Sequence, residues 1–143
     1  MPNSDAFEKK SISAHLVRRM IDAAVAKAGE LGKGFVIAFV DESGVLKALL
    51  RMDGAPLLSV QVAQDKAYTA AGFLMPSHAW HDFIKDDGPL ADGAPTGIDR
   101  LVIFGGGYPI EVDGEIVGAI GVSGSHYSED MQVAEAALAA VAQ

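Results

Sequence analysis

The chain has 143 residues, half of them hydrophobic and none of them cysteine, with 19 acidic side chains against 11 basic ones. This length suits one domain with a single core, and the lack of cysteine excludes disulfides, thiolate metal sites and a cysteine nucleophile. The net charge of -8 opposes nucleic-acid binding. No apolar segment approaches bilayer length and the N-terminus does not resemble a secretory signal, so we expect a cytoplasmic protein with no membrane partner.

The first predicted helix covers residues 11–31 and follows an N-terminal extension, residues 1–10. Its apolar residues recur at helical spacing, and the glycines of "GELGKG" suit a left-handed cap at its end. His15 lies on the opposite, polar side together with Arg18 and Arg19. We therefore expect His15 to point away from the core of its own domain.

A hairpin and a second helix come next. "FVIAFVD" and "VLKALLRM" are predicted strands, joined by the turn residues "DESG". Residues 57–74 form a helix with a narrow stripe of small side chains, which indicates close packing on a sheet. Pro76 ends this helix, "SHAWHDFI" predicts a short helix, and "KDDGPLADGAPTG" predicts a long loop.

The last third predicts three strands and a helix. "LVIF" is the first of these strands, and a hairpin centred on Asp113 and Gly114 supplies the other two. Ser128 is the predicted cap of the final helix, which carries Glu129 and Asp130 in its first turn. Because hairpins pair strands antiparallel, the pattern predicts an α+β fold with five strands.

Three consecutive glycines, Gly105, Gly106 and Gly107, interrupt this strand pattern. Glycine allows a positive φ and lets a ligand or another backbone come close. The triplet therefore either borders a binding site or only turns a corner between two strands. Gly118 and Gly121 have the wrong spacing for a dinucleotide-binding loop, so we expect them to let the alanine-rich helix approach the last strand.

The four histidines fall into three settings. His78 and His81 are three residues apart on a predicted helix, but they lack further ligands, so we expect no metal site. His126, followed by Tyr127, lies between a strand end and a helix N-terminus, where anions are favoured. His126 is either a binding residue or an ordinary loop histidine. The third setting is that of His15, on the polar side of the first predicted helix.

Two cations lie near the predicted core. Arg51 and Asp53 belong to the turn "RMDGAP", and Lys66 lies at the border of the apolar stripe of the second helix. In one interpretation, Arg51 pairs with Asp53 and only holds the turn. In the other, Arg51 and Lys66 attract the carboxylate of a ligand, because a cation near a core needs a partner.

Six segments follow one another along the chain: "VDESGVL", "RMDGAP", "DKAYTA", "IFGGGYPI", "GEIVGAIGVSG" and "SEDMQVAEAALAAV". As an ordered set they resemble the GlcG/HbpS-like family, which includes the C-terminal domain of PduO-type corrinoid adenosyltransferases. The resemblance covers residues 11–143. It implies a profilin-like single domain in which helices flank an antiparallel five-stranded sheet, and a homo-oligomer of two or more chains. It also implies a link to haem binding or haem degradation and to catabolic pathways.

Our first functional hypothesis is a cytoplasmic small-molecule-binding protein that takes haem or another carboxylate-bearing ligand. Backbone amides of the glycine triplet and the loop at residues 123–127 would form its pocket, and His15 or His126 would be the axial ligand of haem. The proposed binding residues are His15, Arg51, Asp53, Lys66, Gly105, Gly106, Gly107, His126 and Tyr127.

The second hypothesis is a cofactor-independent lyase or isomerase that acts on a small organic acid. His126 would move the proton, and Arg51 would anchor the acid. A third hypothesis is an accessory subunit without a ligand, which predicts that the pocket is filled by the protein's own side chains.

Overall fold

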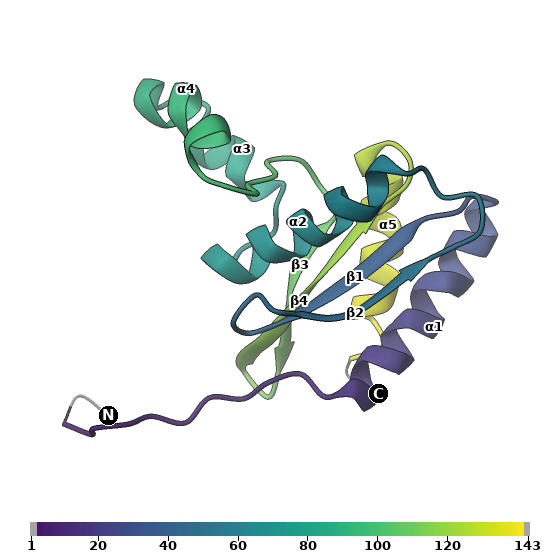
Figure 1. The fold of residues 1–143 in the computed structure, drawn as a ribbon, viewed down its shortest axis with the longest axis horizontal. Helices are drawn as coiled ribbons and strands as arrows, with labels where there is room; N and C mark the ends of the chain where they lie inside the picture. The colour runs from purple at the N-terminus through teal and green to yellow at the C-terminus, as the bar shows by residue number, and fades with distance from the viewer. Residues whose placement is uncertain (1–2, 142–143) are drawn as a thin grey trace.

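A computed structural model describes residues 3–141 and shows a four-stranded antiparallel sheet between two helical layers (Figure 1). The strand order is β2-β1-β4-β3. The strands are β1 (Val36–Asp41), β2 (Leu46–Arg51), β3 (Gly107–Val112) and β4 (Glu115–Ser123). The α+β class and the antiparallel pairing are confirmed.

The described residues also form five helices: α1 (Ala14–Leu31), α2 (Leu58–Phe73), α3 (Ala79–Ile84), α4 (Gly88–Gly97) and α5 (Tyr127–Leu138). α1 and α5 cover one face, α2 covers the other, and α3 with α4 projects beyond one end of the sheet (Figure 1). No helix of the described chain is both long and apolar enough to span a bilayer.

The first helix and both hairpins form where the sequence predicts them. Ser13 caps α1 by accepting the Leu16 N–H, and Gly32 ends the helix in the left-handed region at φ 69°. Asp113 and Gly114 have φ of 50° and 82°, as a type I′ turn between β3 and β4 requires. β1 is buried on both faces, as its continuous apolar run predicts.

The predicted fifth strand is wrong, because residues 101–104 pair with no strand in the described chain. Side chains take the hydrogen bonds that a neighbouring strand would have made. The Val102 N–H donates to Thr69 Oγ1 at 3.0 Å, and the Phe104 carbonyl accepts from Ser77 Oγ at 2.7 Å. Leu101 and Ile103 pack against α3 and α4 instead of joining the sheet.

The loop predicted at residues 85–97 is also wrong over most of its length, because α4 occupies residues 88–97. Asp87 caps this helix by accepting the Leu90 N–H at 3.2 Å. Pro89 lies in the first turn, where a helix needs no N–H donor from it. Pro89 is therefore compatible with a short capped helix, whereas Pro95 lies inside α4 and leaves one helical hydrogen bond unmade.

α2 lies directly on β4, as the small side chains of its stripe predict. A Cβ added to Gly121 would overlap the carbonyl oxygen of Ala63, so only glycine allows this approach. Gly118 does not serve the same purpose. It faces the opposite side of the sheet, where an added Cβ would meet Ile12 and the backbone of Val40.

Candidate functional site

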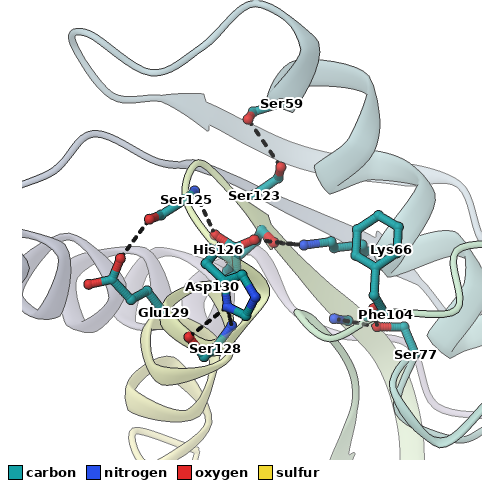
Figure 2. A network of polar contacts seen from close by, with 12 residues as sticks. Ser59, Lys66, Ser77, Phe104, Ser123, Ser125, His126, Ser128, Glu129 and Asp130 are labelled. Atoms are coloured by element: carbon teal, nitrogen blue, oxygen red, sulfur yellow. Dashed lines mark hydrogen bonds and ion pairs between the residues drawn. The ribbon is translucent and has the colours of Figure 1, made fainter. Parts of the chain in front are cut away.

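A buried ion pair lies beneath the glycine triplet. Lys66 Nζ on α2 is 2.9 Å from Asp130 Oδ2 on α5, and their side chains are 0% and 2% exposed (Figure 2). Lys66 Nζ also donates to the Val122 carbonyl at 2.9 Å. Burial lowers the pKa of Lys66 and raises the pKa of Asp130, and the opposite charge of the partner counteracts both shifts. The partner that Lys66 requires is thus a residue of this chain.

The surroundings of this pair hold it in place. Asp130 Oδ1 accepts the Ser125 N–H at 3.0 Å, which ties the loop before α5 to the pair. The half-exposed ring of Phe104 lies with its centroid 5.1 Å from Lys66 Nζ, close enough for a cation–π contact. Figure 2 shows Phe104 beside Lys66, so this ring covers the ammonium group on the side opposite Asp130.

The three glycines are buried and in contact with protein atoms. A Cβ added to Gly105 would overlap Met131, and one added to Gly107 would overlap the Lys66 backbone. Gly106 has a φ of 128°, and an added Cβ would lie 2.7 Å from Lys66 Nζ. The triplet therefore serves the close approach that glycine permits, and the groups that approach it are the protein's own side chains and backbone.

His126 and Tyr127 lie on the surface next to this network. Their ring centroids are 4.1 Å apart, and His126 caps α5 because its Nδ1 accepts the Ser128 N–H at 3.2 Å. The predicted cap, Ser128, is therefore one of the first residues inside the helix. The imidazole Nδ1 reaches the same backbone group that a capping Asn or Asp would reach, which rules based on residue type do not anticipate.

Arg51 lies at the exposed end of β2 and is bound to its own turn. Its Nε and Nη2 donate to the Ala55 carbonyl at 3.2 and 3.0 Å. Asp53 is exposed, and no ion pair joins it to Arg51 within residues 3–141. No hydrogen bond or ion pair of this part of the chain joins Arg51 to Lys66 or His126, although the register Arg51–Val36–Ser123 places Arg51 at the same end of the sheet as the loop that carries His126.

His15 is the second residue of α1 and is exposed, as predicted. Its imidazole makes no hydrogen bond or ion pair with any other described residue. An open recess of about 280 Å³ adjoins this part of the chain, where residues 10–16 meet β3 and β4. The recess is lined by Lys10, Ser11, Ile12, Ser13, Leu16, Val112 and Val117.

The other two histidines do not form a shared site. His81 is exposed, with Nδ1 3.9 Å from Asp82 Oδ1, while half-buried His78 places its ring edge on Tyr108. Within residues 3–141 no three His, Asp or Glu side chains gather as metal ligands would.

Two contributors to this region escape sequence analysis. Asp130 looks like an ordinary acidic residue favouring the N-terminus of a helix, although it is the partner of Lys66, 64 residues away. Ser77 looks like part of a linker, although its Oγ binds both the Phe104 carbonyl and the Gly107 N–H. Helix periodicity alone could have placed Asp130 on the buried side, next to Val133 and Ala134.

Comparisons with known proteins cover nearly the whole chain. A family model described as "Haem degrading protein HbpS-like" matches residues 12–139. The "Uncharacterized 15.0 kDa protein in dhaT-dhaS intergenic region" of Citrobacter freundii is 35% identical over 128 residues, which are 90% of each chain.

Solved structures agree with this match. The ORFY protein of Klebsiella pneumoniae superposes with a TM-score of 0.90 at 27% identity, covering 97% of this chain and 96% of that one. A complex of PduOC with haem superposes with a TM-score of 0.81 at 32% identity, covering 92% of this chain and 95% of that one.

Proposed function

The chain belongs to the HbpS-like family, and from this premise we propose that it binds haem, with His15 as the ligand to the iron. The solved complex of PduOC with haem supports the choice of haem as the bound molecule. The observation that carries the proposal is the exposed imidazole of His15, which has no competing side-chain partner in the described chain. His15 does not itself line the apolar recess, but its neighbours Ser13 and Leu16 do.

The residues around this recess fit a haem. Ile12, Leu16, Val112 and Val117 offer apolar contacts for one edge of a porphyrin. Lys10 also lines the recess, and its ammonium, 4.0 Å from Glu115 Oε1, would exchange this exposed partner for a propionate. A neutral imidazole nitrogen is a common axial ligand of haem iron. When bound, haem would supply an iron centre whose reactivity depends on that ligand and on the polarity around it.

His126 is the weaker of the two histidine candidates. Its Nδ1 accepts the Ser128 N–H and thereby caps α5. To bind iron through Nε2 as a neutral imidazole, the ring would carry its proton on Nδ1, which would remove this acceptor. Iron binding at His126 would therefore compete with the start of α5, whereas His15 has no such conflict.

The test is a titration with haemin followed in the Soret region. We expect a saturable Soret shift with the wild-type chain that is lost or strongly weakened in His15→Ala, because the axial ligand is gone. His126→Ala and His81→Ala serve as matched controls, since each removes an exposed histidine from another surface, and both should retain the shift. A wild-type spectrum that stays that of free haemin, or a His15→Ala titration equal to wild type, would contradict the proposal.

The proposal includes a cytoplasmic homo-oligomer and leaves open another carboxylate-bearing ligand in place of haem. Leu57 and Leu58, at the start of α2, support association with a further chain because they are 76% and 80% exposed. Arg51, Asp53 and the loop at residues 123–127 lie at one end of the sheet, and they stay candidates for contacts with such a ligand.

A further inference from the structure

A second cavity lies on the opposite face of the sheet from the recess of α1, at the same end, where Lys9 contacts Glu42 and Ser43 of the β1–β2 turn. An open cleft of about 550 Å³ separates the β1–β2 turn and the C-terminal half of α2 from the segment that follows α4. This volume falls in the range of roughly 300–1,000 Å³ that is usual for small-molecule sites. Three aromatic side chains line it: Tyr68 and Phe73 from α2 and Trp80 from α3.

The charges at this cleft are all negative. Glu42 and Asp99 line it, and no lysine or arginine does. Glu42 is already paired, with Oε2 3.0 Å from Lys9 Nζ. Asp99 is exposed and has neither an ion pair nor a hydrogen bond within residues 3–141, so its carboxylate is available to a ligand.

The guanidinium of Arg100 already packs on the aromatic wall of the cleft. Arg100 lies 4.0 Å above the ring of Tyr68, and its charge is balanced by Asp65 at 2.8 Å. One face of Tyr68 thus already accepts a positive group. Because Arg100 is occupied by Asp65 and Tyr68, it does not offer the cleft a free positive charge.

Trp80 completes the same wall. Its side chain is only 5% exposed, and its ring packs on Phe73 and Phe83 with centroid distances of 5.0 and 5.6 Å. Its Nε1 is buried and has no hydrogen-bond acceptor in the described part of the chain. Trp80 therefore contributes the apolar surface of its ring to the cleft.

We infer that this cleft is a binding site for a small organic cation, an amine with an apolar body. The aromatic wall takes the apolar body, and Asp99 neutralises the ammonium group. None of the residues that line the cleft lines the recess near His15, so the two sites have separate linings and different residues can be substituted to test each.

The single tryptophan of the chain makes the site directly observable, because Trp80 is its only source of tryptophan fluorescence. The probes are phenethylamine and phenylacetate, which carry the same ring and opposite charges. We expect a saturable change of the Trp80 emission with phenethylamine and a much weaker one with phenylacetate. Asp99→Asn should weaken the amine about threefold, the size of an exposed ion pair. Asp92→Asn, which removes an exposed carboxylate from α4 outside the cleft, should change nothing.

A blocking variant provides the second arm. Gly72 lines the cleft, and a Cβ there meets no atom within 4 Å, so Gly72→Leu adds bulk without displacing protein atoms. It should abolish the phenethylamine response while haemin binding persists. Gly29→Leu is the matched control, because Gly29 is also a helical glycine with open space at its Cβ, and it should retain the response.

Three results would overturn the inference: no saturable response to phenethylamine, equal affinity for phenylacetate, or full amine affinity in a folded Gly72→Leu variant. If Gly72→Leu does not fold by circular dichroism, the comparison of Asp99→Asn with Asp92→Asn decides instead. Loss of the haemin response together with an intact amine response would refute the haem proposal alone.

Discussion

Lys66 combines two properties that are associated with reactive lysines, namely full burial and a lowered pKa. Its contacts nevertheless describe a structural group. Asp130 and the Val122 carbonyl each accept a hydrogen bond from Nζ, and Gly106 packs so closely that no substrate atom could enter between them. We therefore interpret the pair as a link between α2, β4 and α5.

Lys66→Met tests this interpretation. Removing one member of a buried ion pair leaves the other charge without compensation, so we expect a loss of roughly 3–5 kcal/mol in the free energy of unfolding. Urea denaturation measures it. The double variant Lys66→Met/Asp130→Asn should recover much of that loss, because no unpaired charge then stays buried.

Lys33→Met is the matched control for this prediction. Lys33 pairs with Glu129, one residue before Asp130, but its side chain is 48% exposed. An exposed pair contributes little, so the loss of stability should be far smaller than for Lys66→Met. Equal effects of the two substitutions would show that the buried pair is not a special link.

At the scale of elements, the contact between α2 and β4 depends on the absence of side chains. Ala63, Ala67 and Ala70 form the buried stripe of α2, and Gly121 lets that stripe reach the backbone of β4. This approach brings Lys66 close enough to Asp130, across the end of the sheet, to form the ion pair. A small-residue stripe and one glycine thus position the candidate site.

Gly121→Ala should destabilise the protein by roughly 1–3 kcal/mol or more, because the new methyl group would overlap the Ala63 carbonyl and α2 would have to shift. Gly29→Ala should instead stabilise it by about 0.5–1 kcal/mol, since Gly29 is in a helix and its Cβ position is open. Chemical denaturation of both variants measures the difference. A neutral Gly121→Ala would mean that α2 does not need this close approach.

At the scale of the whole molecule, several polar contacts attach the N-terminal segment to the domain. The Ile12 N–H donates to the Val117 carbonyl at 3.0 Å, and Lys9 Nζ contacts Glu42 Oε2 and Ser43 Oγ on the β1–β2 turn. Hydrogen bonds from Ser43, Ser11 and Lys9 lower the pKa of Glu42 from 4.5 to about 2. The end of the extension predicted at residues 1–10 is therefore bound partly through the ionised carboxylate of Glu42.

This attachment predicts a pH dependence of stability. Because the folded pKa of Glu42 lies below its unfolded value, its contribution is present above about pH 4.5 and is lost as the pH falls toward 2. Glu42→Gln should therefore be less stable than wild type near neutral pH, and the two should converge as the pH approaches 2. Thermal denaturation across this range measures the effect. Glu8→Gln, an exposed carboxylate without an ion pair in the described chain, is the control, and a gap that persists at low pH would contradict the assignment.

The sequence indicates which residues of the candidate site are unusual, but it does not indicate which groups they contact. Lys66 and the glycine triplet were identified as unusual, and the structure does bring them together. The partner, however, could not be read from local patterns, because a helix-starting aspartate looks the same whether solvent or a distant lysine surrounds it. The placement of Arg51 and the loop of His126 at one end of the sheet likewise depends on how the strands pair.

The sequence by itself determined α1, the two hairpins, the α+β class and the family, because helical and strand periodicity, caps and turn residues act over a few neighbouring positions. Only the tertiary structure decided that residues 101–104 attach to Thr69 and Ser77 instead of forming a fifth strand, and that Asp130 neutralises Lys66. The same holds for the cleft beside Trp80. Each of these features depends on contacts between groups distant in the chain, which form only when the helices pack on the sheet. Local propensity carries no information about such long-range contacts.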